Sequence, residues 1–347
     1  MNVAILTHPL ISNYGGILQA WSLKVFLENC GHKCIILDYR VRPSFVKRIL
    51  IYLLNSFFYA RNKNLKKRTL LLDEFIQKNI KRTKKIYSVL ALNRMIEAHG
   101  IDAIIVGSDQ VWRRSFTISR GIGTYFLSFI APEKSILKVA YAASFAKSEW
   151  EYTCDETVLI RNWINEFNAV SVREESAVHL CKDQLSMEAE HTLDPTLLLD
   201  PVSFSSLISE TPIDSNYVFI YWLGKESDLN EEIKKYNFTN RKLLVVSHKT
   251  KTILSMEQWL SAIKFADTVL TDSFHGCVFS IVFKKHFIIC RNDDGGNDRL
   301  ISLFNTLGLE EKLKTPDSNE DYTMIEDRIN ILRKQSSDFL INALKQH

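Results

Sequence analysis

The chain has 347 residues, of which 46% are hydrophobic and 24% are charged, and its formal net charge is +4. This composition is typical of a soluble globular protein, and the length predicts two domains, each with its own core. The six cysteines are scattered without a CxxC pair or a histidine at zinc spacing. They therefore argue against a metal site or a disulfide framework and fit a reducing cytoplasm.

The first half of the chain alternates β-rich runs with amphipathic helical windows, which predicts an α/β protein with parallel sheets. The first helix should follow the first strand and end at Gly31, as a helix with a C′ glycine does. We expect further helices at 152–168 and 174–183. The predicted strands are 2–7, 33–39, 102–108, 138–145 and 169–174.

The loop after the first predicted strand reads SNYGG and leads directly into the first helix. Two adjacent glycines suit a sharp turn or a close approach of the backbone to a ligand. The motif lacks the third glycine of GxGxxG and the lysine of a P-loop, so a ligand role and a purely structural turn both stay open. The candidate ligand-binding residues are Asn13, Tyr14 and Gly15.

The segment from Arg40 to Lys85 contains fourteen Lys and Arg against two acidic residues, a local charge of +12. A basic region beside the apolar stretch 49–60 favours contact with an anionic membrane surface. The alternative is a helix packed on its own domain with solvated lysines. The clustered aromatics argue against nucleic acid. The apolar stretch is too short to span a bilayer, and the chain starts with a predicted strand instead of a signal peptide, so we expect a cytoplasmic protein. Contact through the basic segment would make it peripheral to the inner membrane.

Polar residues follow two more of the predicted strands. At the end of the strand predicted at 102–108, Gly107, Ser108 and Asp109 follow the apolar run DAIIV without a break, and the acid could orient a sugar hydroxyl, act as a base on it, or simply cap a turn. Arg173 ends the strand at 169–174, ahead of Glu174 and Glu175. The helix dipole explains the two acids, whereas the arginine suits a carboxylate or phosphate, or pairs with one of those acids.

A second series of elements begins after the two prolines of 193–201. Its predicted strands are 217–223, 242–247, 267–272 and 286–291, and apolar spacing over 324–345 predicts a closing helix. We expect a Rossmann-like domain at 1–200 with a basic amphipathic insertion at about 43–90, and a second at 201–322. The two should face each other across a cleft, with the helix of 323–347 packing back on the first domain.

The stretch TDSFHG joins a predicted strand to a helix, with Ser273 as the N-cap and His275 in the first turn. Free N–H groups at a helix start bind anions, and an imidazole among them can move a proton. The alternative is a histidine satisfied in a buried turn. Gly276 belongs to the same turn, and Arg299 begins a later helix.

The ordered motifs NYGGILQ, VGSDQVW, YAASF, SVREES, LDPTLLL, SFHGCVFSIVF and NDRLISLFNTLGLE resemble the polysaccharide pyruvyl transferase family. The resemblance covers residues 3 to 310 approximately and leaves out 43–90 and the C-terminal tail. It implies a GT-B-like fold and transfer of a pyruvyl group from phosphoenolpyruvate to two hydroxyls of a sugar, as a cyclic ketal.

Carried over position by position, the resemblance implies that His275 and Asp109 are catalytic. We expect His275 to be the general acid; in the alternative, His275 donates a hydrogen bond to the phosphate, and Asp109 or an unidentified acid protonates the methylene carbon. The resemblance implies that Arg173 and Arg299 bind the carboxylate and phosphate of the donor, beside the candidate substrate-binding residues Ser273, Gly276, Ser108, Asn13, Tyr14 and Gly15. The acceptor would be a sugar or lipid-linked oligosaccharide of a bacterial surface polysaccharide, with no metal and no cofactor beyond the co-substrate.

Two other functions remain open on the sequence. A nucleotide-sugar-dependent glycosyltransferase of the same fold would bind a UDP- or GDP-sugar and would not respond to phosphoenolpyruvate. A catalytically silent glycan-binding or scaffold protein would tolerate His275→Ala. The number of polar residues placed after strands argues against the second.

Overall fold

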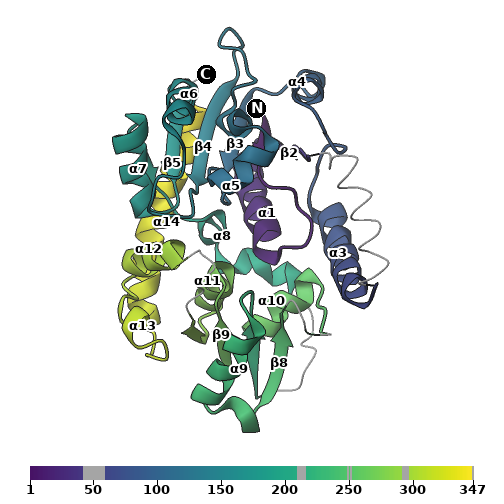
Figure 1. The fold of residues 1–347 in the computed structure, drawn as a ribbon, viewed down its shortest axis with the longest axis vertical. Coiled ribbons are helices and arrows are strands. Elements are labelled where there is room, and N and C mark those ends of the chain that lie inside the picture. The colour runs from purple at the N-terminus through teal and green to yellow at the C-terminus, as the bar shows by residue number, and fades with distance from the viewer. Residues whose placement is uncertain (42–58, 209–215, 248–249, 251, 291–296, 346–347) are drawn as a thin grey trace.

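A computed structural model describes residues 1–41, 59–208, 216–247, 250, 252–290 and 297–345. Two parallel sheets lie one above the other in Figure 1, each in its own half of the molecule. The long C-terminal helix runs along one side and spans both halves. This is the predicted arrangement of an α/β protein with two Rossmann-like domains.

All nine predicted strands are confirmed, with ends that differ by one or a few residues. The additional strand β6 was not predicted, because two residues are too few to show a pattern. The strands are β1 (Asn2–Leu6), β2 (Lys33–Ile36), β3 (Ala103–Gly107), β4 (Leu137–Ala143), β5 (Ala169–Val172), β6 (Glu190–His191), β7 (Tyr217–Tyr221), β8 (Lys242–Val246), β9 (Thr268–Thr271) and β10 (His286–Ile289).

The predicted helices are confirmed as well, including the closing helix. The α-helices are α1 (Tyr14–Asn29), α3 (Tyr59–Asn79), α4 (Val89–Ala98), α5 (Arg114–Thr117), α6 (Cys154–Ile164), α7 (Glu175–Leu185), α8 (Pro195–Leu198), α9 (Glu226–Lys235), α10 (Met256–Lys264), α11 (Phe274–Val282), α12 (Asn297–Leu307), α13 (Glu311–Lys314) and α14 (Tyr322–Leu344). Short 3₁₀ turns are η1 (Ile118–Arg120), η2 (Ile122–Phe126), η3 (Pro201–Leu207) and η4 (Phe238–Asn240).

The first helix begins and ends where local chemistry directs it. The Asn13 side chain accepts a hydrogen bond from the Gly16 amide at 3.2 Å, which caps the α1 N-terminus. Gly31 has a φ of 85°, a left-handed conformation that glycine adopts without strain just after a helix. Residues 14–24 of α1 are all buried, so this helix lies inside the molecule instead of on its surface.

Strand order determines where a ligand can approach each sheet. The first sheet runs β2-β1-β3-β4-β5-β6 and the second runs β10-β9-β7-β8, with every pair parallel. In the first sheet β2 lies on one side of β1 and the later strands lie on the other, so the strand order reverses between β1 and β3. In the second sheet the strand order reverses in the same way between β7 and β9. Ligands of open parallel sheets bind beyond the carboxyl ends of the strands at such switch points.

Packing joins the two halves firmly. Tyr14 of α1 stacks on Trp259 of α10 with ring centroids 5.2 Å apart, and its hydroxyl donates to the Leu254 carbonyl at 2.7 Å. On the other side, the Glu175 amide of α7 donates to the Ser302 hydroxyl of α12 at 2.9 Å. These contacts hold the switch point of one sheet opposite that of the other.

The C-terminal helix α14 contacts both halves. Near its start, the Tyr322 hydroxyl donates to the Lys285 carbonyl in the second half. Near its end, the Ser336 hydroxyl accepts from the Leu193 amide at 3.0 Å and the Phe339 ring lies 6.3 Å from that of Tyr141 in β4. The helix therefore returns the chain to the first sheet.

The described part of the basic segment is α3 and the chain after it, whereas residues 42–58 fall outside the described ranges. Leu72, Phe75 and Ile76 of α3 are buried, and the helix contacts α1 in one half and α10 in the other. Lys66 and Lys67 are exposed. The helix thus packs on the molecule and presents lysines to solvent. No helix within the described ranges is both long and apolar enough to cross a membrane.

Candidate functional site

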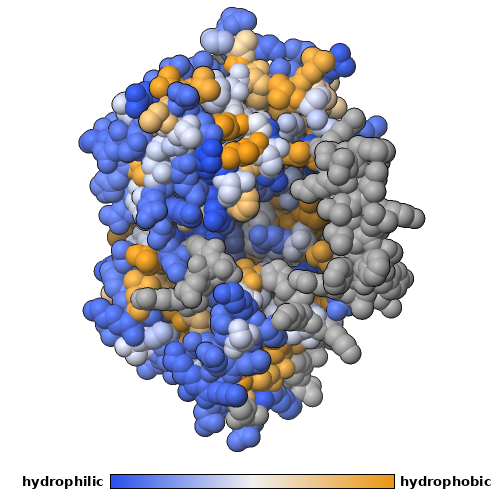
Figure 2. All heavy atoms as spheres, in the orientation of Figure 1, coloured by the Kyte–Doolittle hydropathy of each residue, from blue (hydrophilic) through white to orange (hydrophobic). Residues whose placement is uncertain are grey.

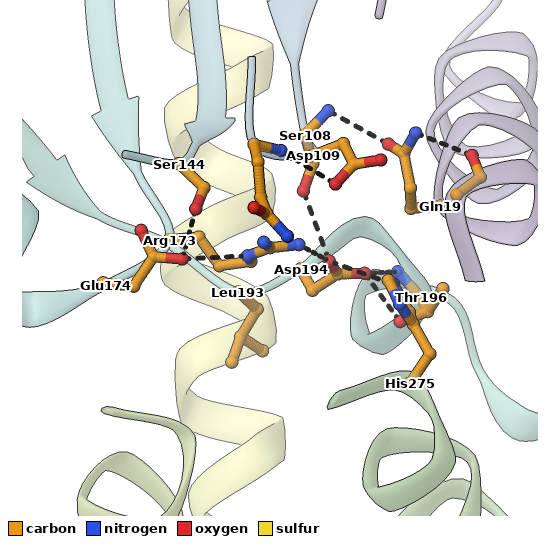
Figure 3. Close-up of polar contacts among 12 residues, drawn as sticks. Gln19, Ser108, Asp109, Ser144, Arg173, Glu174, Leu193, Asp194, Thr196 and His275 are labelled. Carbon is orange, nitrogen blue, oxygen red and sulfur yellow. Dashed lines mark hydrogen bonds and ion pairs between the residues drawn. The ribbon is translucent and has the colours of Figure 1, made fainter. Parts of the chain in front are cut away.

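Polar side chains from both halves converge between the two sheets. The first half contributes residues after β3, β5 and β6 together with the start of α1, and the second contributes the starts of α11 and α12. Figure 3 shows this cluster, with Arg173 at its centre and His275 reaching it from α11. The space-filling view is hollowed between the two halves (Figure 2). The site therefore lies where the strand order predicts one.

The guanidinium of Arg173 is bound to carboxylates through two of its three nitrogen atoms. Its Nη1 donates to Asp194 Oδ2 at 2.8 Å and its Nε to Glu174 Oε1 at 3.3 Å, and Glu174 Oε1 also accepts from the Ser144 hydroxyl at 2.7 Å. All four side chains are buried. The two carboxylates hold the guanidinium in one plane and one orientation, which preorganises its remaining N–H groups.

Asp194 joins most of the cluster through its two oxygens. Oδ1 accepts from the Thr196 amide at 3.0 Å and the Thr196 hydroxyl at 2.7 Å. Oδ2 accepts from Arg173 and from the Ser108 hydroxyl at 3.2 Å. His275 Nε2 lies 3.7 Å from the same oxygen, an ion-pair distance when the imidazole is protonated but too long for a hydrogen bond.

These neighbours keep Asp194 ionised. Burial by itself would raise the pKa of this carboxyl, but His275 and Arg173 outweigh burial and hold the pKa well below its usual range. Asp194 is therefore an anion at neutral pH that faces cations from both halves of the protein.

The imidazole of His275 packs directly against the backbone of a glycine, Gly15, in the other half of the protein. A Cβ on Gly15 would lie 2.1 Å from His275 Nδ1, so only a glycine at this position of α1 leaves room for the imidazole. The ring is buried and lies edge-on to Phe274 at 5.1 Å. The sequence placed Gly15 and His275 in separate motifs, and the structure brings them into contact across the domain boundary.

A second arginine, Arg299, lies near Arg173, and both guanidiniums pack on the same aromatic ring. The guanidinium carbons of Arg173 and Arg299 lie 4.6 and 5.7 Å from the centre of the Phe274 ring. Burial, followed by repulsion from Arg173, lowers the pKa of Arg299 to about 10. Both groups stay charged at neutral pH, so the structure holds two cations together against their mutual repulsion.

Three buried nitrogen atoms of this cluster have no hydrogen-bond partner among the described residues: Arg173 Nη2, Arg299 Nε and His275 Nε2. An unpaired buried donor costs about 1–3 kcal/mol, and more when it is charged. An anion between them would satisfy the donors and relieve the repulsion. The cluster therefore offers buried, positively charged donors that an anion would complement.

Asp109 stands at the other end of the site, after β3. Its Oδ1 accepts from the Gln110 amide at 2.8 Å. Burial would raise its pKa, but His8 and Arg173 outweigh burial and lower it. Asp109 is thus a carboxylate at neutral pH, which suits it to accept a proton or hydrogen bond and removes it as a candidate acid.

The other predicted site residues have structural contacts in the free protein. Tyr14 packs between the two halves against Trp259, and Asn13 caps α1. The Ser108 hydroxyl donates a hydrogen bond to Asp194. Ser273 caps α11 by accepting from the Gly276 amide at 3.4 Å. A Cβ on Gly276 would meet Thr271 Oγ1 at 2.3 Å, so close packing of α11 on β9 requires this glycine. Their ligand roles stay predictions.

Sequence reasoning missed two residues of the cluster and left the role of a third open. It explained Glu174 by the helix dipole and gave pairing with Arg173 as an alternative, and the structure confirms the pairing, with the Glu174 side chain buried against Arg173 and Ser144. Asp194 and Ser144 entered it only as members of the motifs LDPTLLL and YAASF. An aspartate before proline is an ordinary helix cap, so its type and spacing carry no sign of its ion pairs. Within the described residues, no group of three or more His, Cys, Asp and Glu could hold a metal ion.

The fold defines the class of protein. UDP-GlcNAc 2-epimerase from Methanocaldococcus jannaschii aligns over 100% of both chains with a TM-score of 0.50 and 11% identity. S. aureus MnaA, in a co-structure with UDP, aligns over 99% of this chain and 98% of its own with a TM-score of 0.50 and 12% identity. The protein has the GT-B fold.

A family model completes the assignment. The model for polysaccharide pyruvyl transferase matches residues 13–294, which include His275, Arg173 and Asp109. The chain belongs to the polysaccharide pyruvyl transferase family. No curated protein matches the sequence.

Proposed function

We propose that this protein transfers a pyruvyl group from phosphoenolpyruvate to two hydroxyls of a sugar in a bacterial surface polysaccharide precursor, forming a cyclic ketal. The observation that carries the proposal is the set of unpaired donors on Arg173, Arg299 and His275 at the domain boundary. Phosphoenolpyruvate carries a carboxylate and a phosphate on the same carbon, C2. Two guanidiniums on one aromatic ring match such a pair of anions.

In the proposed reaction, a proton is added to the methylene carbon of the donor, and a sugar hydroxyl oxygen forms a bond to C2. The second hydroxyl oxygen then bonds to C2 as the bond from C2 to the phosphate oxygen breaks. One hydroxyl proton replaces the proton that the donor received, and the other leaves with phosphate. No metal or further cofactor is needed for this balance.

The side chains of the site could carry out these steps as two groups, one that binds the anions of the donor and one that moves protons. Arg173 and Arg299 would bind the anionic groups, and each charge-assisted hydrogen bond contributes about 1.5–3 kcal/mol. His275 would give the proton to the methylene carbon, with its Nε2 atom 3.7 Å from Asp194 Oδ2. Asp109, as a carboxylate, would accept the proton of a hydroxyl.

We expect Arg299→Ala to weaken phosphoenolpyruvate binding by about tenfold or more, the loss of one good charge-assisted contact. Isothermal titration calorimetry of wild type and variant measures this directly. Arg241→Ala is the matched control, because Arg241 lies at the amino end of β8 in a solvent-exposed pair with Asp267. It should bind phosphoenolpyruvate as wild type does.

The same titration includes UDP-glucose and GDP-mannose. Binding of a sugar nucleotide in place of phosphoenolpyruvate would contradict the proposed donor and support glycosyl transfer. Binding of phosphoenolpyruvate with equal affinity by wild type and Arg299→Ala would contradict the placement of the donor between the arginines.

We further propose that the protein works in the cytoplasm and that the basic segment docks on the anionic inner surface of the membrane, where a lipid-linked acceptor would be presented. The proposal rests on the local charge of +12 and on the exposed lysines of the described part. Each basic residue near an anionic surface contributes about 1 kcal/mol.

Reversing Lys66, Lys67 and Lys78 to Glu should therefore abolish cosedimentation with vesicles containing phosphatidylglycerol at low salt. These three lysines are exposed on α3, away from the buried Leu72, Phe75 and Ile76 that hold the helix in place. Reversal of three exposed lysines elsewhere, Lys182, Lys225 and Lys314, is the control for net charge. Equal loss in both variants, or none in either, would contradict docking through α3.

A further inference from the structure

A small cavity lies beside the anion cluster, at the switch point of the first sheet. It has a volume of 170 Å³ and opens between the turn after β1 and the turn after β3. This volume is below the ~300 Å³ of a typical drug-sized site. Its lining is His8, Pro9, Leu10, Ile11, Asn13, Gly16, Ile17, Asp109, Gln110 and Phe116.

The cavity has the mixed chemistry of a sugar site. Phe116 is 37% exposed and meets the His8 ring edge-on at 5.2 Å, which forms an aromatic wall. Asp109, Asn13 and Gln110 contribute carboxylate and amide groups. A pyranose ring presents C–H faces to aromatic rings and hydroxyls at its edge, so this lining complements one sugar ring and not an extended anion.

His8 is a polar residue of the cavity that has no role in the proposed binding of phosphoenolpyruvate. Its Nδ1 lies 3.3 Å from the Tyr125 hydroxyl, and its Nε2 is buried with no hydrogen-bond partner among the described residues. The main chain of Gln110 lies beside the ring, but outside hydrogen-bonding geometry to Nε2. A hydroxyl both donates and accepts, so it would satisfy Nε2 in either tautomer.

The cavity and the anion cluster share one residue. Asp109 lines the cavity, and its charge also acts on Arg173. The start of α1 lies between the two regions: Gly15 contacts His275, and a Cβ on Gly16 would lie 3.3 Å from Asp109 Oδ2. A sugar in the cavity would therefore present its hydroxyls to a carboxylate at the edge of the anion cluster.

We infer that the cavity between the β1 and β3 turns is the acceptor subsite, that it binds a single pyranose ring against Phe116 and His8, and that Asp109 receives a proton from one of its hydroxyls. The inference rests on the proposed function for the identity of the reaction. The subsite itself is defined by sugar binding, which is measured without turnover.

The test uses the full-length protein with two separate probes. Phosphoenolpyruvate is followed by calorimetry. Methyl glycosides of glucose, galactose, mannose, N-acetylglucosamine and N-acetylmannosamine are followed by saturation-transfer NMR. Phe116→Ala should weaken binding of the best glycoside by about tenfold while phosphoenolpyruvate affinity stays within about twofold. Phe265→Ala, at an exposed phenylalanine after α10, should change neither.

A second readout comes from the histidine rings. The His8 Cε1–H resonance, assigned by its absence in His8→Gln, should shift on addition of the glycoside and not of phosphoenolpyruvate. The His275 resonance should do the reverse. No binding of any of the five glycosides to wild type would overturn the subsite, as would a loss of phosphoenolpyruvate affinity in Phe116→Ala. If the glycoside binds and phosphoenolpyruvate does not, the subsite stands and the proposed donor fails.

Discussion

His275→Gln should lower kcat for ketal formation by about 10²–10⁴-fold, the usual contribution of a general acid. Phosphoenolpyruvate affinity should fall by no more than about tenfold, because the two arginines remain. The glutamine keeps a hydrogen-bond donor near Asp194 but cannot deliver a proton at neutral pH. The measurement is a steady-state kinetic analysis at saturating donor, together with calorimetry on the same variant.

Two further variants distinguish chemistry from folding. Gly15→Ala introduces a carbon where the His275 ring lies, so it should also reduce kcat although the histidine is present. His179→Gln, at an exposed histidine of α7, should leave kcat unchanged. If His275→Gln instead keeps kcat and loses affinity by a hundredfold, His275 is a ligand of the phosphate and another group supplies the proton.

Arg173→Met should be the most destabilising substitution in the cluster. It leaves two buried carboxylates, Glu174 and Asp194, without their guanidinium partner, and breaking a buried ion pair costs about 3–5 kcal/mol. Phosphoenolpyruvate binding should be lost as well. Urea unfolding at pH 7 measures the first effect. Arg241→Met, which breaks only the exposed pair with Asp267, should change the unfolding free energy by about 0–1 kcal/mol.

The pH dependence of this loss follows from Asp194. In wild type its pKa is depressed, so the ion pairs contribute full stability above the ordinary carboxyl pKa near 4, and that stability is lost as pH falls toward the depressed folded value. Without Arg173 the folded carboxyl is less acidic. The difference between variant and wild type should therefore be largest near pH 7 and shrink below about pH 4. A difference that is constant from pH 7 to pH 3 would contradict the ionic role of the pair.

The sequence was sufficient for the elements and for the class of fold. Short β-rich runs alternate with helical windows, and each run became a strand because buried parallel strands consist of nearly continuous apolar residues. Local chemistry also placed the end of α1 and the cap of α11, because Gly31 and Ser273 act through atoms a few residues away. The ordered motifs were sufficient for the family.

Only the tertiary structure decided which polar residues work together. His275 packs against Gly15, which lies 260 residues earlier in the chain. Asp194 contacts Arg173, Ser108 and His275, which come from three different segments. A carboxylate before proline and an acid at a helix start look alike in sequence whether they face water or a buried guanidinium. Their charge state and role depend on burial and on neighbours that are distant in sequence, because electrostatic energy depends on distance in space and on the exclusion of water.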